Sequence, residues 1–115
     1  MRKLTLIVAL ALAAPALAQD QNHSGHVVTT EDPVVEAWIA ANAKMHEGMA
    51  IEFSGNADVD FVRGMIAHHQ GAIDMARIVL EHGSDPEIRK LAEEIITAQE
   101  GEIAWMEQWL KDHAE

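Results

Sequence analysis

Methionine and histidine residues gather in the middle of the chain at spacings that would place them on one side of a helix. Met45 and Met49 are four residues apart, and Met65 lies three and four residues before His68 and His69. Residues three or four apart are neighbours on a helix surface. Thioether sulfur and imidazole nitrogen, in a chain without cysteine, suit monovalent copper, and silver through the same softness. The spacing therefore predicts a soft-metal site.

Hairpin geometry predicts that the candidate ligands meet at one level of a helical bundle. If antiparallel helices reverse near Gly55 and Ser84, the inward polar and sulfur-bearing residues of three segments fall in one layer. They are Met45, His46, Met49, Met65, His68, His69, Gln99 and Glu102. His68 and His69 point about 100° apart, so we expect one to bind the ion and the other to support it or to serve a second ion. Met75 lies about 10 Å along the axis from His68, too far to share its ion.

Other interpretations of the same residues stay open. Methionine is also a good filler of irregular cores, and histidines can satisfy each other in a structural or interaction module that binds no metal. The set of His46, His68, His69 and Glu102 would also suit zinc or divalent copper. A nucleophile paired with a base, a phosphate-binding loop and the Glu-x-x-His pattern of di-iron bundles are all missing. We therefore expect a binding protein and not an enzyme, with a copper-dependent oxidase as the last alternative.

The start of the chain predicts export. Residues 1–18 combine Arg2 and Lys3, an apolar run too short to span a bilayer, and Ala16-Leu17-Ala18, which fits signal-peptidase cleavage. Without this segment the chain has six basic and nineteen acidic residues, a net charge of −13. Such a charge argues against nucleic acid as a partner. We expect a periplasmic or secreted protein with no membrane anchor after cleavage.

The remaining chain predicts an all-α fold. Residues 19–31 are a polar arm, and 32–115 form one helical metal-binding domain. Helices are expected over 33–53, 59–82 and about 86–113, starting at aspartate caps and separated by glycine-containing breaks. Short connections make them an up-down-up antiparallel bundle of three helices. Since three helices enclose little core, we expect a second copy to complete the bundle as a homodimer.

Residues 60–76, with the sequence DFVRGMIAHHQGAIDMA, resemble the core signature of the CopM-like family of exported bacterial proteins. The Met45-His46-x-x-Met49 element and residues 91–103 resemble its flanking helices. The resemblance implies a ferritin-like helical bundle, periplasmic copper binding and copper resistance. It carries over to Met45, His46, Met49, Met65, His68, His69 and Met75. We therefore expect a protein that sequesters or delivers copper.

Overall fold

The protein is all-helical. The computed structural model describes residues 31–114, which form α1 (Pro33–Met49), α2 (Ala57–His82) and α3 (Pro86–His113), with no strand in that range. The expected signal peptide and residues 19–30 of the arm lie outside the described residues. No helix within residues 31–114 is long and apolar enough to cross a membrane. The predicted all-α class and the order of three helices are confirmed.

Each helix begins at a polar side chain that caps its first free amides. Asp32 accepts a hydrogen bond from the amide of Val34 (2.8 Å), and Asp85 accepts one from the amide of Glu87 (2.9 Å). Both aspartates precede a proline, which suits the first helical position because its missing N–H would have no partner there. These two starts were predicted correctly. The remaining helix, α2, begins at Ala57, because its cap is Asn56 and not the expected Asp58.

The first helix is shorter than predicted, since it ends at Met49 and not at residue 53. Residues 50–56 form a loop, and the carboxylate of Asp60 in α2 binds the end of this loop. This carboxylate accepts hydrogen bonds from the Ser54 amide (2.9 Å), the Ser54 hydroxyl (2.8 Å) and the Gly55 amide (3.2 Å). Gly55 has a φ of 86°, which favours glycine. These bonds direct the amides of Ser54 and Gly55 to Asp60 and not to a continued first helix.

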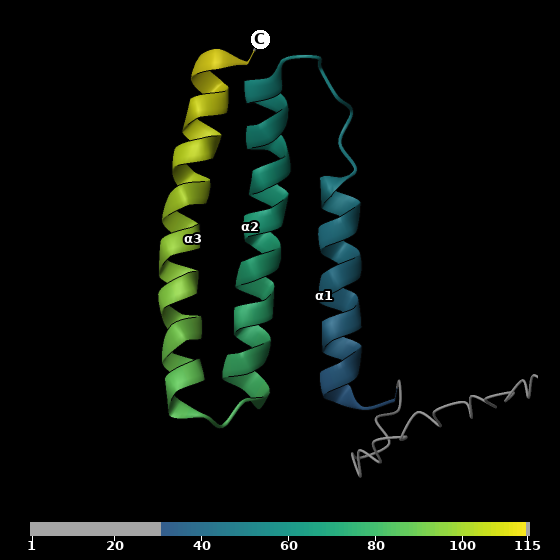
Figure 1. Cartoon of the computed structure of the whole chain (residues 1–115), viewed down its shortest axis with the longest axis vertical. Coiled ribbons are helices and arrows are strands. Elements are labelled where there is room, and N and C mark those ends of the chain that lie inside the picture. The colour runs from purple at the N-terminus through teal and green to yellow at the C-terminus, as the bar shows by residue number, and fades with distance from the viewer. Residues whose placement is uncertain (1–30, 115) are drawn as a thin grey trace, which may run out of the picture.

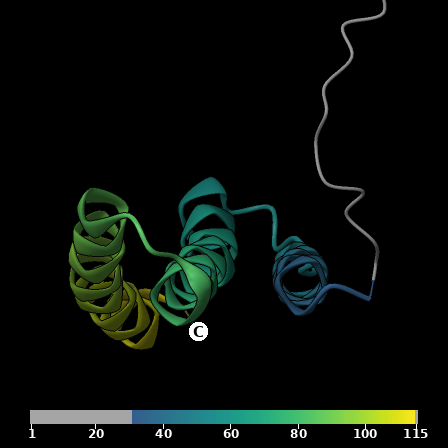
Figure 2. The same cartoon turned by 90° about the horizontal axis from the view of Figure 1, so that it is seen from below.

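The three helices form a single layer with α2 in the middle. Two views at right angles show α1 on one side of α2 and α3 on the other (Figures 1 and 2). In the described part of the chain, α2 contacts both neighbours, whereas no Cα atom of α1 lies within 8 Å of one in α3. The expected antiparallel order is present, but the layer is open and not closed into a triangle.

Small residues let α1 approach α2 closely. A Cβ atom added at Gly48 would lie 3.1 Å from the Cβ of Ala67, and one added at Gly71 would lie 2.7 Å from the sulfur of Met45. Gly64 and Gly101 also lie inside helices, but an added Cβ there would meet no described atom within 4 Å. Close helix packing therefore accounts for two of these glycines and not for the other two.

The core is small and lies where α2 meets its neighbours. The buried apolar side chains are those of Ala41, Val59, Val62, Ile73, Ala76, Ile78, Ala92 and Met106. Several larger apolar residues stay exposed, among them Phe61 (65% exposed) and Trp105 (64% exposed). A single copy of the chain thus leaves a substantial part of its apolar surface open to solvent.

Candidate metal centre

A groove between α2 and α3 is lined by apolar side chains together with two methionines, a histidine and a glutamate. It has a volume of about 260 Å³. Its lining residues are Phe61, Val62, Met65, His69, Glu102, Trp105 and Met106. We call it the His69 groove. Successive turns of α2 supply one wall and α3 supplies the other, so the groove depends on the packing of these two helices.

His69 is held by a carboxylate from the opposite helix. Its Nε2 is hydrogen-bonded to Oε2 of Glu102, and the His69 side chain is only 15% exposed. Because a carboxylate accepts, Nε2 is the donor in this bond, and in the tautomer that has its proton on Nε2 the lone pair is on Nδ1. That Nδ1 is buried and has no hydrogen-bond partner within residues 31–114. Metal-binding histidines are commonly oriented by a carboxylate in this way.

Two thioethers line the same groove. Met65 is four residues before His69, and Met106 is four residues after Glu102, so each methionine is on the same side of its helix as the polar residue. Met65 is half-buried and Met106 is 6% exposed. The groove therefore combines one imidazole, one carboxylate and two sulfur atoms from two helices. Within the described residues, no three histidine, aspartate or glutamate side chains form a metal-binding group on their own.

Met106 also lines this groove, although the sequence did not lead us to propose it as a ligand. The available signal was its spacing from Glu102, which matches that of Met65 from His69. Gln99, which was placed in the predicted layer, is half-buried on α3. Its Oε1 has no hydrogen-bond partner in the described part of the chain.

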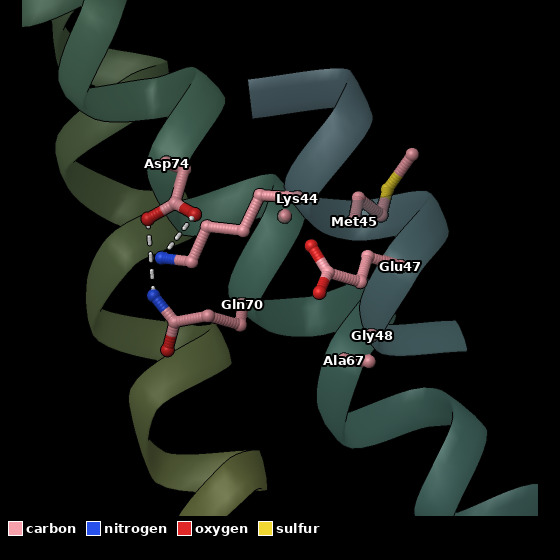
Figure 3. Close-up of a pocket in the computed structure, with 8 residues that line it drawn as sticks. Lys44, Met45, Glu47, Gly48, Ala67, Gln70 and Asp74 are labelled. Atoms are coloured by element: carbon pink, nitrogen blue, oxygen red, sulfur yellow. Dashed lines mark hydrogen bonds and ion pairs between the residues drawn. The ribbon is translucent and has the colours of Figure 1, made fainter. Parts of the chain in front are cut away.

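The candidates on α1 lie elsewhere. Met45 lines a different groove, between α1 and α2, in which Lys44 reaches across to Asp74 with 3.1 Å between Nζ and Oδ2 (Figure 3). His46 is exposed, and Met49 is 37% exposed. The structure thus does not bring the α1 residues into the His69 groove, because α1 and α3 pack against different sides of α2.

Two further candidates on α2 lie outside the groove. His68 is exposed, and its ring centroid is 6.3 Å from that of His69. Met75 lines a second, apolar cavity of about 240 Å³. Its lining residues are Trp38, Ala72, Met75, Ala76, Val79, Ile88, Leu91, Ala92 and Ile95. We call this cavity the Ala72 hollow. Of the predicted site residues, the structure therefore brings together Met65, His69 and Glu102.

The protein is thus a small helical layer with a groove that sulfur, nitrogen and oxygen atoms of side chains line. The chain belongs to the family described as a domain of unknown function (DUF305), whose model matches residues 58–115. The match includes every residue that lines the His69 groove. It is also similar to Uncharacterized protein L153 of Acanthamoeba polyphaga mimivirus, with 38% identity over 55 residues. This alignment covers 48% of the chain and 36% of the viral protein, so the chain spans about a third of that relative.

Proposed function

We propose that this protein is an exported metal-binding protein that holds monovalent copper, and silver by the same chemistry, in the His69 groove. The observation that carries the proposal is the buried Nδ1 of His69, which has no hydrogen-bond partner in the described residues, on a side chain that lines the groove together with two thioethers. A neutral imidazole nitrogen is a strong ligand for copper, and methionine sulfur favours the monovalent ion. The protein would sequester copper or pass it on, without a catalytic step of its own.

The walls of the groove favour a soft ion over a hard one. Phe61, Val62 and Trp105 supply apolar surface around the sulfur atoms. A hard ion such as magnesium prefers water and carboxylate ligands, and zinc, which is borderline, prefers thiolates or several nitrogen and carboxylate ligands. The groove offers one carboxylate, and that carboxylate is already hydrogen-bonded to His69. We infer that Glu102 orients the His69 ring, so that Nδ1 is the nitrogen that binds the ion.

Three further features support this proposal. The segment 60–76 resembles the signature of the CopM-like family, for which periplasmic copper binding and copper resistance are implied. The net charge of −13 after signal cleavage would concentrate cations near the surface. Residues 1–18 would direct the chain to the periplasm, where copper is handled outside the reducing cytoplasm.

Anaerobic titration of the mature protein with cuprous ion, in competition with a calibrated chelator, tests the proposal. Met65→Leu removes a sulfur at nearly constant volume, and His69→Gln keeps a hydrogen-bond donor for Glu102 while removing the imidazole. Each should weaken cuprous affinity by at least about tenfold, or about 1.4 kcal/mol. His82→Ala, at the far end of α2, is the matched control and should leave affinity unchanged.

Circular dichroism must show that each variant remains helical. Unchanged cuprous affinity in a folded Met65→Leu, His69→Gln double variant would contradict the proposal, and the groove would then be ordinary core packing. Parallel titration with zinc separates the soft-metal proposal from a zinc site, because a zinc site should lose affinity in His69→Gln but not in Met65→Leu.

A further inference from the structure

The His69 groove and the Ala72 hollow open on the same face of the three-helix layer. Phe61, His68 and Met75 are seven residues apart and so follow one stripe along α2. Phe61 lines the groove and Met75 lines the hollow, with exposed His68 midway between them. The two concavities therefore lie end to end along α2, on a face that nothing covers within the described residues.

The two ends of this face have complementary shapes. At the groove end, Phe61 is 65% exposed and Trp105 is 64% exposed, so both rings project from the surface. At the hollow end, the small residues Ala72, Ala76 and Ala92 leave an apolar concavity. In an isologous dimer the same surface of both copies forms the contact. The exposed rings at the groove end of one copy can therefore pack into the hollow of the other, and the same contact forms a second time with the copies exchanged.

Charge also favours a second copy on this face. Glu102 is the only charged residue among those that line the two concavities, and it is paired with His69. Ion pairs lie instead where Lys44 meets Asp74 and where Arg77 meets Glu100. Two copies of a strongly acidic chain repel each other less when they meet over uncharged surface than when they bring carboxylates together. The apolar face meets that condition, and a helical layer needs a second layer to bury its apolar side.

If two copies meet through this face, a twofold axis that lies in the interface and is perpendicular to the helices would bring the groove of one copy over the hollow of the other. It places α2 antiparallel on α2 of the partner, with the groove of each copy over the hollow of the other. The groove is centred near residue 65 of α2 and the hollow near residue 75. When these two centres face each other across antiparallel helices, the numbers of facing residues sum to about 140. In this arrangement Phe61 would meet the partner's Val79, and Met65 would meet the partner's Met75.

We propose that two copies of this chain pack through this face and that the partner's Met75 completes each metal site. This inference rests on the proposed function, since it adds a ligand to the same groove. Met65 and His69 come from one copy, and the facing thioether comes from the other. It gives a role to Met75, which lies about 10 Å along α2 from His68 and too far to bind the same ion within one chain.

The first test is the mass of the mature protein in solution without metal, measured by light scattering at micromolar concentration. The wild-type chain should be a dimer, and Phe61→Asp should shift it to a monomer. Phe53→Asp is the matched control, because Phe53 is 77% exposed but lies in the loop before α2 and lines neither concavity. A wild-type monomer, or equal effects of the two aspartates, would overturn the inference.

The second test asks whether a site is shared between copies. Met65→Leu and Met75→Leu should each weaken cuprous binding by about tenfold in their own dimers. When the two variants are mixed, unfolded and refolded together, each mixed dimer has one site with both methionines intact. Equal mixing should restore tight binding at about a quarter of the wild-type sites.

The outcomes separate this inference from the proposed function. If the wild-type chain binds no cuprous ion, the proposed function and the shared site both fail, whatever the mass shows. If the wild type binds but Met75→Leu has wild-type affinity, the shared site is wrong and the groove of one chain is sufficient. If both variants are defective but mixing restores nothing, both methionines act within one chain and the shared site is again refuted.

Discussion

Replacing Gly71 by alanine should destabilise the protein, although alanine is the better helix former. An alanine Cβ at this position would lie 2.7 Å from the sulfur of Met45, 2.8 Å from its Cγ and 3.0 Å from its Cβ. Glycine to alanine inside a helix gains about 1 kcal/mol. Overpacking a well-packed contact costs about 1–3 kcal/mol. Because the Cβ of Met45 cannot move without α1, we expect the cost to exceed the gain by about 1 kcal/mol.

Gly101→Ala is the control for this prediction. Gly101 is exposed inside α3, and an added Cβ meets no described atom within 4 Å. This variant should gain stability of up to about 1 kcal/mol. Urea unfolding followed by circular dichroism, at one fixed protein concentration, gives both differences.

A double-mutant cycle identifies the clashing partner of the new methyl group. Met45→Ala removes the Cγ and sulfur atoms that an alanine at Gly71 would meet. It should therefore cost less in the Gly71→Ala chain than in the wild type, by about 1 kcal/mol. If Gly71→Ala stabilises as much as Gly101→Ala, then α1 does not lie against α2 as described, and the open layer itself is wrong.

Two shorter predictions concern the loop and the leader. Hydrogen bonds from the amide and hydroxyl of Ser54 lower the pKa of Asp60, and the Gly55 amide and Arg63 add to this effect. The pKa of Asp60 is therefore lower in the folded protein than in the unfolded chain. The stability that Asp60 adds is present above the unfolded pKa and is lost as the pH falls through the folded pKa. Asp60→Asn should thus be less stable than wild type at neutral pH and equally stable in strong acid, and a constant difference in urea midpoints across that range would contradict this. Intact mass of the exported protein should show cleavage after Ala18, and a periplasmic species that begins at Met1 would exclude it.

Local sequence was sufficient to predict where two of the helices begin. Asp32-Pro33 and Asp85-Pro86 combine a cap with a residue whose backbone suits the first turn, and no tertiary contact is needed for either. The end of α1 could not be predicted in the same way. Residues 50–53 contain no helix breaker, and their loop depends on Asp60, which lies in the next helix.

The candidate site was predicted in part for a similar reason. Helical periodicity identifies which side of a helix is apolar, but it does not identify which neighbour covers each edge of that side. The prediction placed α1 around the same interior as α3. In the structure α1 packs on the far side of α2, so Met45 meets Gly71 and not His69. The pairing of His69 with Glu102 depends only on α2 and α3, and both residues were in the predicted layer.

The width of the apolar stripe on α3 is the part of the pattern that a single chain leaves unexplained. Ala92 and Met106 lie along one edge of the stripe and are buried against α2. Leu91 and Trp105 lie along the other edge and are 49% and 64% exposed. A helix that packed against one neighbour only would need just the first edge, because a stripe of about 100° serves one contact surface. The second edge faces the same side as the His69 groove and the Ala72 hollow, where a second layer of helices would bury it and would bring Met75 of one copy to the sulfur and imidazole of the other.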